Sequence, residues 1–412
     1  MAADLAIWLI AAAAIVGVVA RPWGVPEVWW ALAGAAALIL SSLIARADAI
    51  AAVLAGSDVY LFLTGMMLLS ELARREQLFD WLAAYAVAHA RGSPQRLFAL
   101  VYGVGILVTV LLSNDATAVV LTPAVYAATR HAGARPLPYL LACAFIANAA
   151  SFVLPISNPA NLVVFGAHMP ALGAWLEQFS AASAVSIALT FVVLRWTQRT
   201  ALAGRIARPK TQPALRLGGR LAAGGVAATA VLLLGASALG WPLGLPTCLA
   251  GAGTVLAVWL VNRENPWPVA QGVSWSILPL VGSLFVLARA IENTGILAPL
   301  QRVLSAHATS APHAAAAASG IAVGLACNLV NNLPLGLIAG TVARGAHLSS
   351  HLTGALLIGV DLGPNLSVTG SLATLLWLVA LRREGEQIGA LKFLALGACV
   401  MPPALLATLA VF

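Results

Sequence analysis

The chain has few charged residues, and this scarcity excludes a soluble globular protein. Charged residues make up 9% of its 412 residues, whereas hydrophobic residues make up 61% and the mean hydropathy is +0.94. A soluble domain carries about 25% charged residues. The composition therefore excludes a soluble fold and predicts a multi-pass protein of the cell (inner) membrane.

Cysteines are also scarce. The four cysteines lie in apolar runs, and no two of them form a Cys-x-x-Cys pair. This spacing predicts neither a disulfide framework nor a zinc site. No basic segment precedes the first apolar run, so a cleaved signal peptide is not expected. We expect no metal and no cofactor.

The net charge of +8 is unevenly distributed. Seven basic residues and no acidic residue lie between Arg195 and Arg220. A short basic loop stays in the cytoplasm and is attracted to anionic lipid. We therefore interpret this charge as a topology signal and expect no nucleic-acid partner. Glycines and prolines in the same stretch predict a linker between two halves.

Polar residues and glycines recur along the chain at one fixed spacing. The pairs, each 217 residues apart, are Asn114 and Asn331, Asn148 and Asn365, and Gly65 and Gly282. Three coincidences at one spacing predict a duplicated unit. A duplicated membrane unit with polar breaks in matching positions is typical of a transporter whose site lies between the repeats.

The duplication predicts an all-α polytopic membrane protein of two inverted-topology repeats. Broken helices and re-entrant hairpins would meet at the membrane midplane. A span needs roughly 20 apolar residues, and the apolar runs predict about 10 to 13 crossings. The predicted units are an N-terminal membrane helix at 1–27, a first repeat at 28–199, a basic cytoplasmic linker at 200–220, a second repeat at 221–385 and a C-terminal membrane helix at 386–412.

Asparagines concentrate in two short windows. Eight of the eleven lie within 114–161 and 328–365. Amides are costly in hydrocarbon unless they are hydrogen-bonded, so they indicate a lined cavity or a tight interhelical network. We favour the cavity. Prolines and glycines in the same windows break the helices, and the free backbone groups at such breaks can hold a polar solute or an ion.

Two acidic residues, Asp115 and Asp361, lie inside apolar runs. Burying a charged carboxylate costs several kcal/mol, so an intramembrane acid is a functional candidate by default. The alternative is a carboxyl group that a nearby hydroxyl or amide satisfies. For Arg289 and Glu292 we expect an ion pair within one helix.

At these residues the chain resembles the ArsB-type arsenite and antimonite efflux transporters of the ion transporter superfamily. The stretches that carry the resemblance are Gly359 to Trp377, Asn331 to Pro334, Asn114-Asp115, Leu121 to Pro123, and Ser157-Asn158. One departure is Pro159, where carboxylate-transporting relatives tend to have threonine. That departure argues against a dicarboxylate site.

The resemblance implies export of trivalent arsenic or antimony as a neutral hydroxide in exchange for protons, and no enzymatic activity. Neutral As(OH)₃ needs hydrogen-bonding amides and hydroxyls more than a fixed counter-charge. The candidate substrate-binding residues are Asn114, Ser157, Asn158, Asn331, Asn332, Asn365, Thr369 and Ser371. Asp115 and Asp361 are the candidates for proton coupling, and Cys143 and Cys327 are secondary candidates for metalloid contact.

The resemblance also allows a soluble, arsenite-stimulated ATPase as a partner. The chain has no nucleotide-binding loop, so any use of ATP would come from that partner. A sodium/proton antiporter or a sodium-coupled organic-anion transporter of the same fold is the alternative, and sodium dependence would distinguish it. An intramembrane aspartyl protease would need Asp115 and Asp361 in Tyr-Asp and Gly-x-Gly-Asp contexts, which this sequence lacks.

Overall fold

The computed structural model describes residues 2–166, 169–207, 214–263 and 265–412, and the regular elements in these ranges are all helical. Seven of the described helices are long and apolar enough to cross a membrane. They are α1 (Ala2–Ala20), α6 (Pro94–Leu111), α11 (Leu172–Thr197), α12 (Leu217–Ala238), α13 (Gly244–Asn262), α17 (Pro312–Val330) and α21 (Ala390–Val411).

Two bent helix pairs raise the number of candidate spans to nine. The pair α3 (Arg46–Ala55) and α4 (Ser57–Arg75) bends by 44°, and the pair α15 (Ile277–Asn293) and α16 (Ala298–Ser310) bends by 82°. Both totals are below the 10 to 13 crossings predicted from the apolar runs. Several of those runs form helices that are too short to span about 30 Å of hydrocarbon.

The short helices lie mainly around the breaks that prolines and glycines predict, so the expectation of broken helices is confirmed. They are η1 (Pro22–Gly24), α2 (Glu27–Leu40), α5 (Leu78–His89), α7 (Asn114–Ala116), the π-helical turn η2 (Thr117–Leu121), α8 (Thr122–His131), α9 (Leu137–Ala149), η3 (Pro155–Ser157), α10 (Pro159–Phe165), α14 (Trp267–Gly272), α18 (Asn332–Gly345), α19 (Ser350–Leu362), η5 (Gly363–Leu366) and α20 (Leu372–Arg383).

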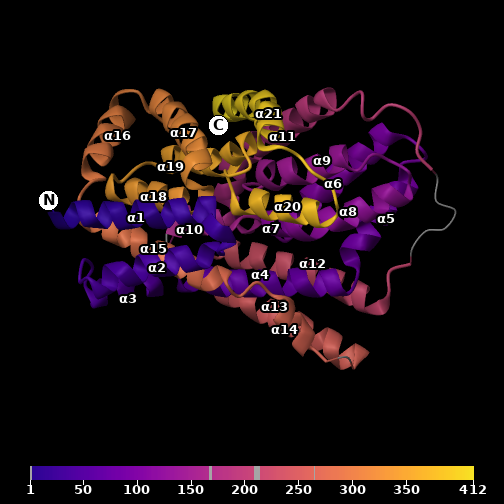
Figure 1. Ribbon diagram of the computed structural model, residues 1–412, viewed down its shortest axis with the longest axis horizontal. Coiled ribbons are helices and arrows are strands. Elements are labelled where there is room, and N and C mark those ends of the chain that lie inside the picture. The colour runs from indigo at the N-terminus through magenta and orange to yellow at the C-terminus, as the bar shows by residue number, and fades with distance from the viewer. Residues whose placement is uncertain (1, 167–168, 208–213, 264) are drawn as a thin grey trace.

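Helices of the two halves follow the same order. Helix α4 carries Gly65 and α15 carries Gly282, while α6 and α17 each precede a break that begins a shorter helix. By this order α1 corresponds to α12, and α11 corresponds to α21. In Figure 1, α1 starts at the left end of the molecule and α12 starts near the linker at the right, so these two helices run in opposite directions.

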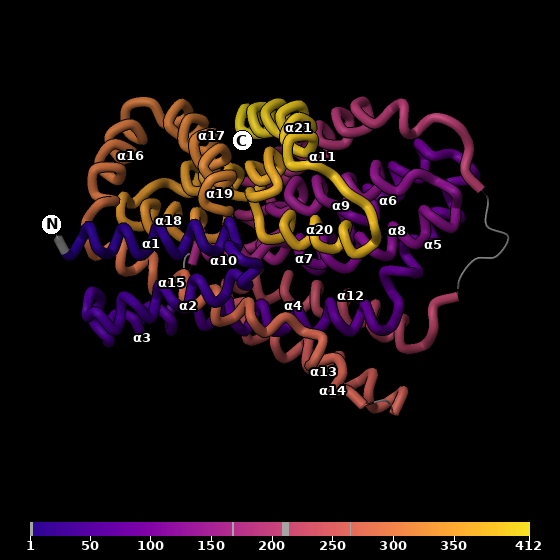
Figure 2. The backbone as a smooth tube through the Cα atoms, in the orientation of Figure 1, coloured from indigo at the N-terminus to yellow at the C-terminus, as the bar shows by residue number. Residues whose placement is uncertain are grey.

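The helices form two layers, which are easiest to follow in the tube view of Figure 2. One layer contains α2 to α4 and α12 to α15, with α1 along its edge; the other contains α5 to α11 and α16 to α21. Within the first layer the two halves of the chain interlock, because α4 packs along α13 while α15 packs along α2 and α3. Separating the halves would therefore expose buried faces of these helices.

Glycine allows α4 and α13 to touch. A Cβ atom on Gly65 would lie 2.2 Å from the carbonyl oxygen of Thr247, and one on Gly251 would lie 2.5 Å from the carbonyl oxygen of Gly65. Small residues at such crossings let helix backbones approach in membranes. This contact gives a packing reason for Gly65, one of the two glycines that lie 217 residues apart.

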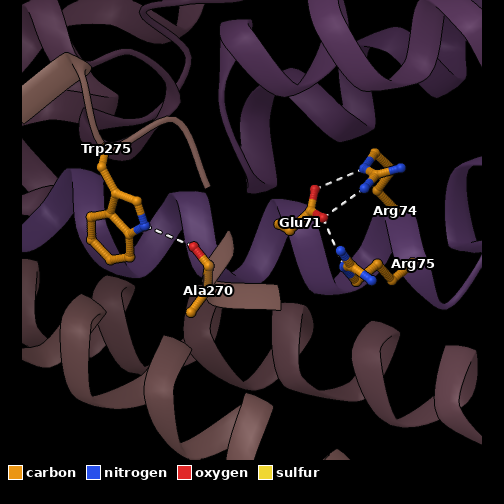
Figure 3. Close-up of polar contacts among 5 residues, drawn as sticks. All are labelled: Glu71, Arg74, Arg75, Ala270 and Trp275. Atoms are coloured by element: carbon orange, nitrogen blue, oxygen red, sulfur yellow. Dashed lines mark hydrogen bonds and ion pairs between the residues drawn. The ribbon is translucent and has the colours of Figure 1, made fainter. Parts of the chain in front are cut away.

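Charges at the end of α4 are paired. The buried Glu71 accepts hydrogen bonds from Arg74 at 2.7 and 2.6 Å and from Arg75 at 2.8 Å (Figure 3). Nearby, the indole nitrogen of Trp275 donates to the carbonyl oxygen of Ala270 at 2.7 Å. Among the other charged residues, Arg289 and Glu292 form the expected ion pair at 3.1 Å.

The linker is tied to the second layer where it leaves α11. The backbone N–H of Ile206 donates to Gly92 and that of Ala207 donates to Ala132, at the ends of α5 and α8. Arg208 and Lys210, which contribute to the predicted basic loop, lie outside the described residues.

Candidate transport site

Polar side chains cap the four helices that begin at the breaks. An N-cap oxygen satisfies one of the backbone N–H groups left free at a helix start. In each cap a backbone N–H donates to the side-chain oxygen of the N-cap residue. The pairs are Ala116 with Ser113 at 3.1 Å, Ala160 with Asn158 at 3.0 Å, Leu333 with Asn331 at 3.4 Å, and Thr374 with Ser371 at 3.1 Å. Several residues predicted from the sequence to bind substrate therefore also start a helix.

A small cavity lies where these helix starts converge, and helices of both layers line it. Its polar wall consists of Asn114, Asp115, Asn158 and Asn332, all from the second layer. Its apolar wall includes Leu63 of α4 and Ile277 and Val281 of α15; the remaining residues are Pro159, Leu333, Leu372 and Ala373. The positive ends of the helix dipoles face this space and favour oxygen atoms that accept hydrogen bonds.

Two of the polar residues have side chains free to meet a ligand. The Asn332 side chain is 4% exposed, and no hydrogen bond to its amide group is found within the described part of the chain. The Asp115 carboxylate is likewise without a hydrogen-bond donor among the described residues, although its backbone N–H donates to Asn114 Oδ1 at 2.9 Å. The cavity thus offers an amide and a carboxyl group on the same wall.

Asp361 lies behind this wall. It is 0% exposed, and its Oδ1 accepts a hydrogen bond from Asn158 Nδ2 at 2.7 Å. Its other oxygen, Oδ2, is buried and has no partner within the described residues. Asp361 is not among the residues that line the cavity. The contact joins α10 of the first half to α19 of the second.

Asn148 and Asn365, which are 217 residues apart, bond directly to each other. Asn148 Nδ2 donates to Asn365 Oδ1 at 3.0 Å, and Asn365 Nδ2 donates to the carbonyl oxygen of Phe145 at 3.0 Å. Ser371 adds a hydroxyl donor to Asn148 Oδ1 at 3.4 Å. The structure uses Asn365 and Ser371 to join α9 to the second half.

We expect Asn365→Ala to destabilise the protein by about 1–3 kcal/mol, because it removes two buried hydrogen bonds, one with Asn148 and one with the carbonyl oxygen of Phe145. The measurement is thermal unfolding of the purified protein in detergent. Asn293→Ala is the matched control, since Asn293 is exposed and should change the unfolding temperature little. Equal unfolding temperatures for the two variants would contradict a structural role for Asn365.

Three further predicted residues hold the loops at the breaks. Ser157 accepts from the Leu154 N–H and donates to Val110, while Thr369 donates to the carbonyl oxygen of Asn328 at 2.8 Å. Asn331 has a positive φ of 76° and donates to the carbonyl oxygen of Thr369. The structure places these three side chains beside the cavity wall rather than on it.

Both secondary cysteine candidates are buried. Cys143 lies beside Thr122, and the Cys327 thiol donates to the carbonyl oxygens of Gly359 at 3.8 Å and Val360 at 3.7 Å. Neither lines the cavity. Within the described residues, no cluster of three His, Cys, Asp or Glu side chains could hold a metal ion.

Sequence reasoning did not identify the apolar wall of the cavity. Leu63 and Val281 lie in the two glycine-containing runs, 63–67 and 280–284, whose glycines share the 217-residue spacing. That spacing is the feature of the sequence that points to Leu63 and Val281. Hydrophobicity alone cannot separate a residue that faces a cavity from one that faces lipid, so nothing in the sequence points to Ile277.

The fold defines a class of protein: a multi-pass membrane transporter with broken helices, whose starts meet at the cavity. A family model described as "Citrate transporter" (CitMHS) matches residues 6–361, and the chain belongs to this family. These findings indicate a transporter rather than an enzyme.

Several relatives support the resemblance to ArsB-type transporters. An arsenical pump membrane protein of Escherichia coli is 28% identical over 424 residues, covering 96% of this chain and 95% of the relative. A second one, from Escherichia coli strain K12, is 27% identical and covers 84% of this chain and 83% of the relative. An uncharacterized transporter of Mycobacterium tuberculosis is 28% identical and covers 90% and 89%.

Among solved structures, the YdaH transporter of Alcanivorax borkumensis is similar in fold. Its TM-score is 0.57 at 16% sequence identity, and the match covers 88% of this chain and 86% of that chain. At this identity the likeness concerns the fold alone.

Proposed function

We propose that the protein exports trivalent metalloid hydroxides, arsenite and antimonite, from the cytoplasm in exchange for protons. The observation that carries the proposal is the cavity wall formed by Asn114, Asn158, Asn332 and Asp115. Three amides and one carboxyl group offer both donors and acceptors to a small neutral hydroxide. The relatives named as arsenical pump membrane proteins support the same substrate class.

The two halves act as inverted-topology repeats around this site. The opposite directions of α1 and α12 and the reciprocal packing of α4 and α15 support this arrangement. The basic linker then marks the cytoplasmic side. Substrate would reach the cavity from that side, and the amides and hydroxyls around the helix breaks would replace its hydration.

Transport into inverted membrane vesicles tests the proposed function. Arsenite should accumulate when a proton gradient is imposed, and collapse of the gradient should remove the accumulation. Replacing sodium by potassium should have no effect. Accumulation that depends on sodium, or none with arsenite or antimonite, would contradict the proposal.

Proton coupling is assigned first to Asp115, because its carboxyl group lines the cavity and no side chain neutralises it within the described residues. Asp115→Asn keeps the shape of the side chain and removes its titration. We expect this variant to bind arsenite with an affinity within about tenfold of the wild type, the effect of roughly one hydrogen bond. It should fail to accumulate arsenite against a gradient.

The Asp115→Asn experiment compares equilibrium binding with gradient-driven uptake in the same preparation. Asp58→Asn is the control, because Asp58 also lies on a membrane helix but bonds to the backbone of Gly244 away from the cavity. Full proton-driven accumulation by the Asp115→Asn protein would show that the proton is carried elsewhere.

Organic-anion transport is the second candidate, since the matched family is described as citrate transporters and the helix starts around the cavity favour anions. However, no arginine or lysine of the described ranges lines the cavity, and Asp115 would repel a carboxylate. Competition distinguishes the two: citrate should not inhibit arsenite uptake if the metalloid site is as proposed.

A further inference from the structure

The hydrogen bond between Asn158 and Asp361 connects the cavity to a buried acid that a ligand in the cavity does not touch. Asn158 lines the cavity and is 3% exposed, while Asp361 lies behind it and is 0% exposed. Their contact distance is 2.7 Å, short for an amide donor and typical of a charge-assisted bond. A proton on Asp361 would therefore alter how Asn158, which meets the ligand, is held.

Both ends of the Asn158 side chain are held. Its Nδ2 donates to Asp361 Oδ1, and its Oδ1 accepts from the Ala160 N–H at the start of α10. The amide plane is fixed by these two bonds. An amide nitrogen carries two hydrogens, so the second one remains available as a donor at the cavity wall.

Asp361 has one oxygen in place to receive a proton. Its Oδ2 is buried without a partner in the described part of the chain, although buried polar atoms are normally hydrogen-bonded. Such an orphaned oxygen is a suitable acceptor for a transported proton. The proton would bind at Oδ2 and leave from the same atom.

Other ionisable groups on the helices packed against α19 do not neutralise Asp361. The thiol of Cys327 on α17 is its neighbour and donates to backbone oxygens. Cys143 lies beside Thr122. The remaining groups point elsewhere. Glu177, Arg195, His313, Lys392 and Cys399 are exposed, and His351 at the start of α19 lies against His313 and Phe412. Tyr139 donates to Pro94, and Arg344 donates to Val164 and Thr341.

We propose that Asp361 is a positioning residue that couples proton binding to ligand binding through Asn158. When Asp361 is charged, it holds the Asn158 amide in the orientation that donates into the cavity. When a proton binds at Oδ2, the charge is lost, the bond to Asn158 weakens, and the donor is no longer held for the ligand.

The sign of this coupling suits an exchanger. Protonation weakens ligand binding, and by thermodynamic reciprocity a bound ligand weakens proton binding by the same factor. Proton and ligand therefore occupy the site alternately. This inference deepens the proposed function and rests on it for the identity of the ligand.

The first test measures arsenite affinity of the reconstituted protein as a function of pH. In the wild type the Kd should increase about 5- to 10-fold as the pH falls and Asp361 becomes protonated. Asp361→Asn should have the weaker affinity throughout and should lose the part of this increase that Asp361 causes. Asp115→Asn should keep that part. An Asp361→Asn protein with the wild-type pH dependence would overturn the proposal.

Asn158→Ser is the key second variant. Serine caps a helix about as well as asparagine, so α10 should still form, but the donor to Asp361 is shortened and lost. Its arsenite affinity should match that of Asp361→Asn at every pH, and the double variant should be no weaker than either single one. Additive losses would contradict a shared pathway.

A measurement without ligand separates this proposal from the proposed function. The infrared carboxyl band that disappears in Asp361→Asn should titrate at a different pH in Asn158→Ser than in the wild type. If the wild type binds neither arsenite nor antimonite, the proposed function fails, and the band still decides whether the two residues are linked. An unchanged titration would overturn the link.

Discussion

Asn332→Ala should abolish arsenite resistance in cells that depend on this transporter, while the protein still folds. The Asn332 amide is buried, lines the cavity and has no hydrogen-bond partner among the described residues. Its removal therefore costs a ligand contact without leaving a protein group unpaired. Loss of one such bond weakens binding about tenfold, and we expect at least this loss in the apparent affinity for arsenite.

The measurement combines growth on arsenite with uptake into inverted vesicles at several concentrations. Cys143→Ala and Cys327→Ala are the matched controls, since both thiols are buried outside the cavity. They should retain resistance. If either cysteine variant were as impaired as Asn332→Ala, sulfur ligation would have to be included in the mechanism.

Gly359→Val should prevent the protein from folding. Helices α17 and α19 cross in close contact, and a Cβ atom on Gly359 would lie 2.3 Å from the carbonyl oxygen of Gly320. One turn further, a Cβ on Gly363 would lie 2.3 Å from the carbonyl oxygen of Gly324. A larger side chain must separate two backbones at this crossing, and overpacking of this kind costs about 1–3 kcal/mol or more.

The expected result is loss of the monodisperse peak in size-exclusion chromatography of the detergent-solubilised protein. Gly253→Val on α13 is the control, because Gly253 is exposed and a Cβ atom there meets nothing within 4 Å. It should leave the peak unchanged. A Gly359→Val protein with wild-type yield and activity would show that α17 and α19 are further apart.

The prolines and glycines of the two asparagine windows predicted the places where helices break. Pro155 and Pro159 lie where the helical path is broken between α9 and α10, as expected because proline lacks a backbone N–H donor. The repeat limits of 28–199 and 221–385 stay a prediction, and the order of helices would match α1 to α12 and α11 to α21 as well. These outer helices carry no polar residues at the common spacing, so the sequence offered no sign of their relationship.

Other polar residues could not be sorted from the sequence. Asn114 and Asn365 both lie in asparagine-rich windows, yet Asn114 lines the cavity and Asn365 bonds to Asn148 and Phe145. The difference depends on contacts between residues more than 200 positions apart. Local composition contains no information about such partners.

The sequence by itself determined that this protein spans a membrane and that its helices break at two polar clusters, because so few charges and so many apolar runs leave no other stable solution. Only the tertiary structure decided what each polar side chain does. The crossing of the two halves brings Asn158 of the first against Asp361 of the second, and it leaves Asn332 free at the cavity. Hydrogen bonding in hydrocarbon requires a partner within about 3 Å, and that partner is set by the packing of helices rather than by neighbours in the chain.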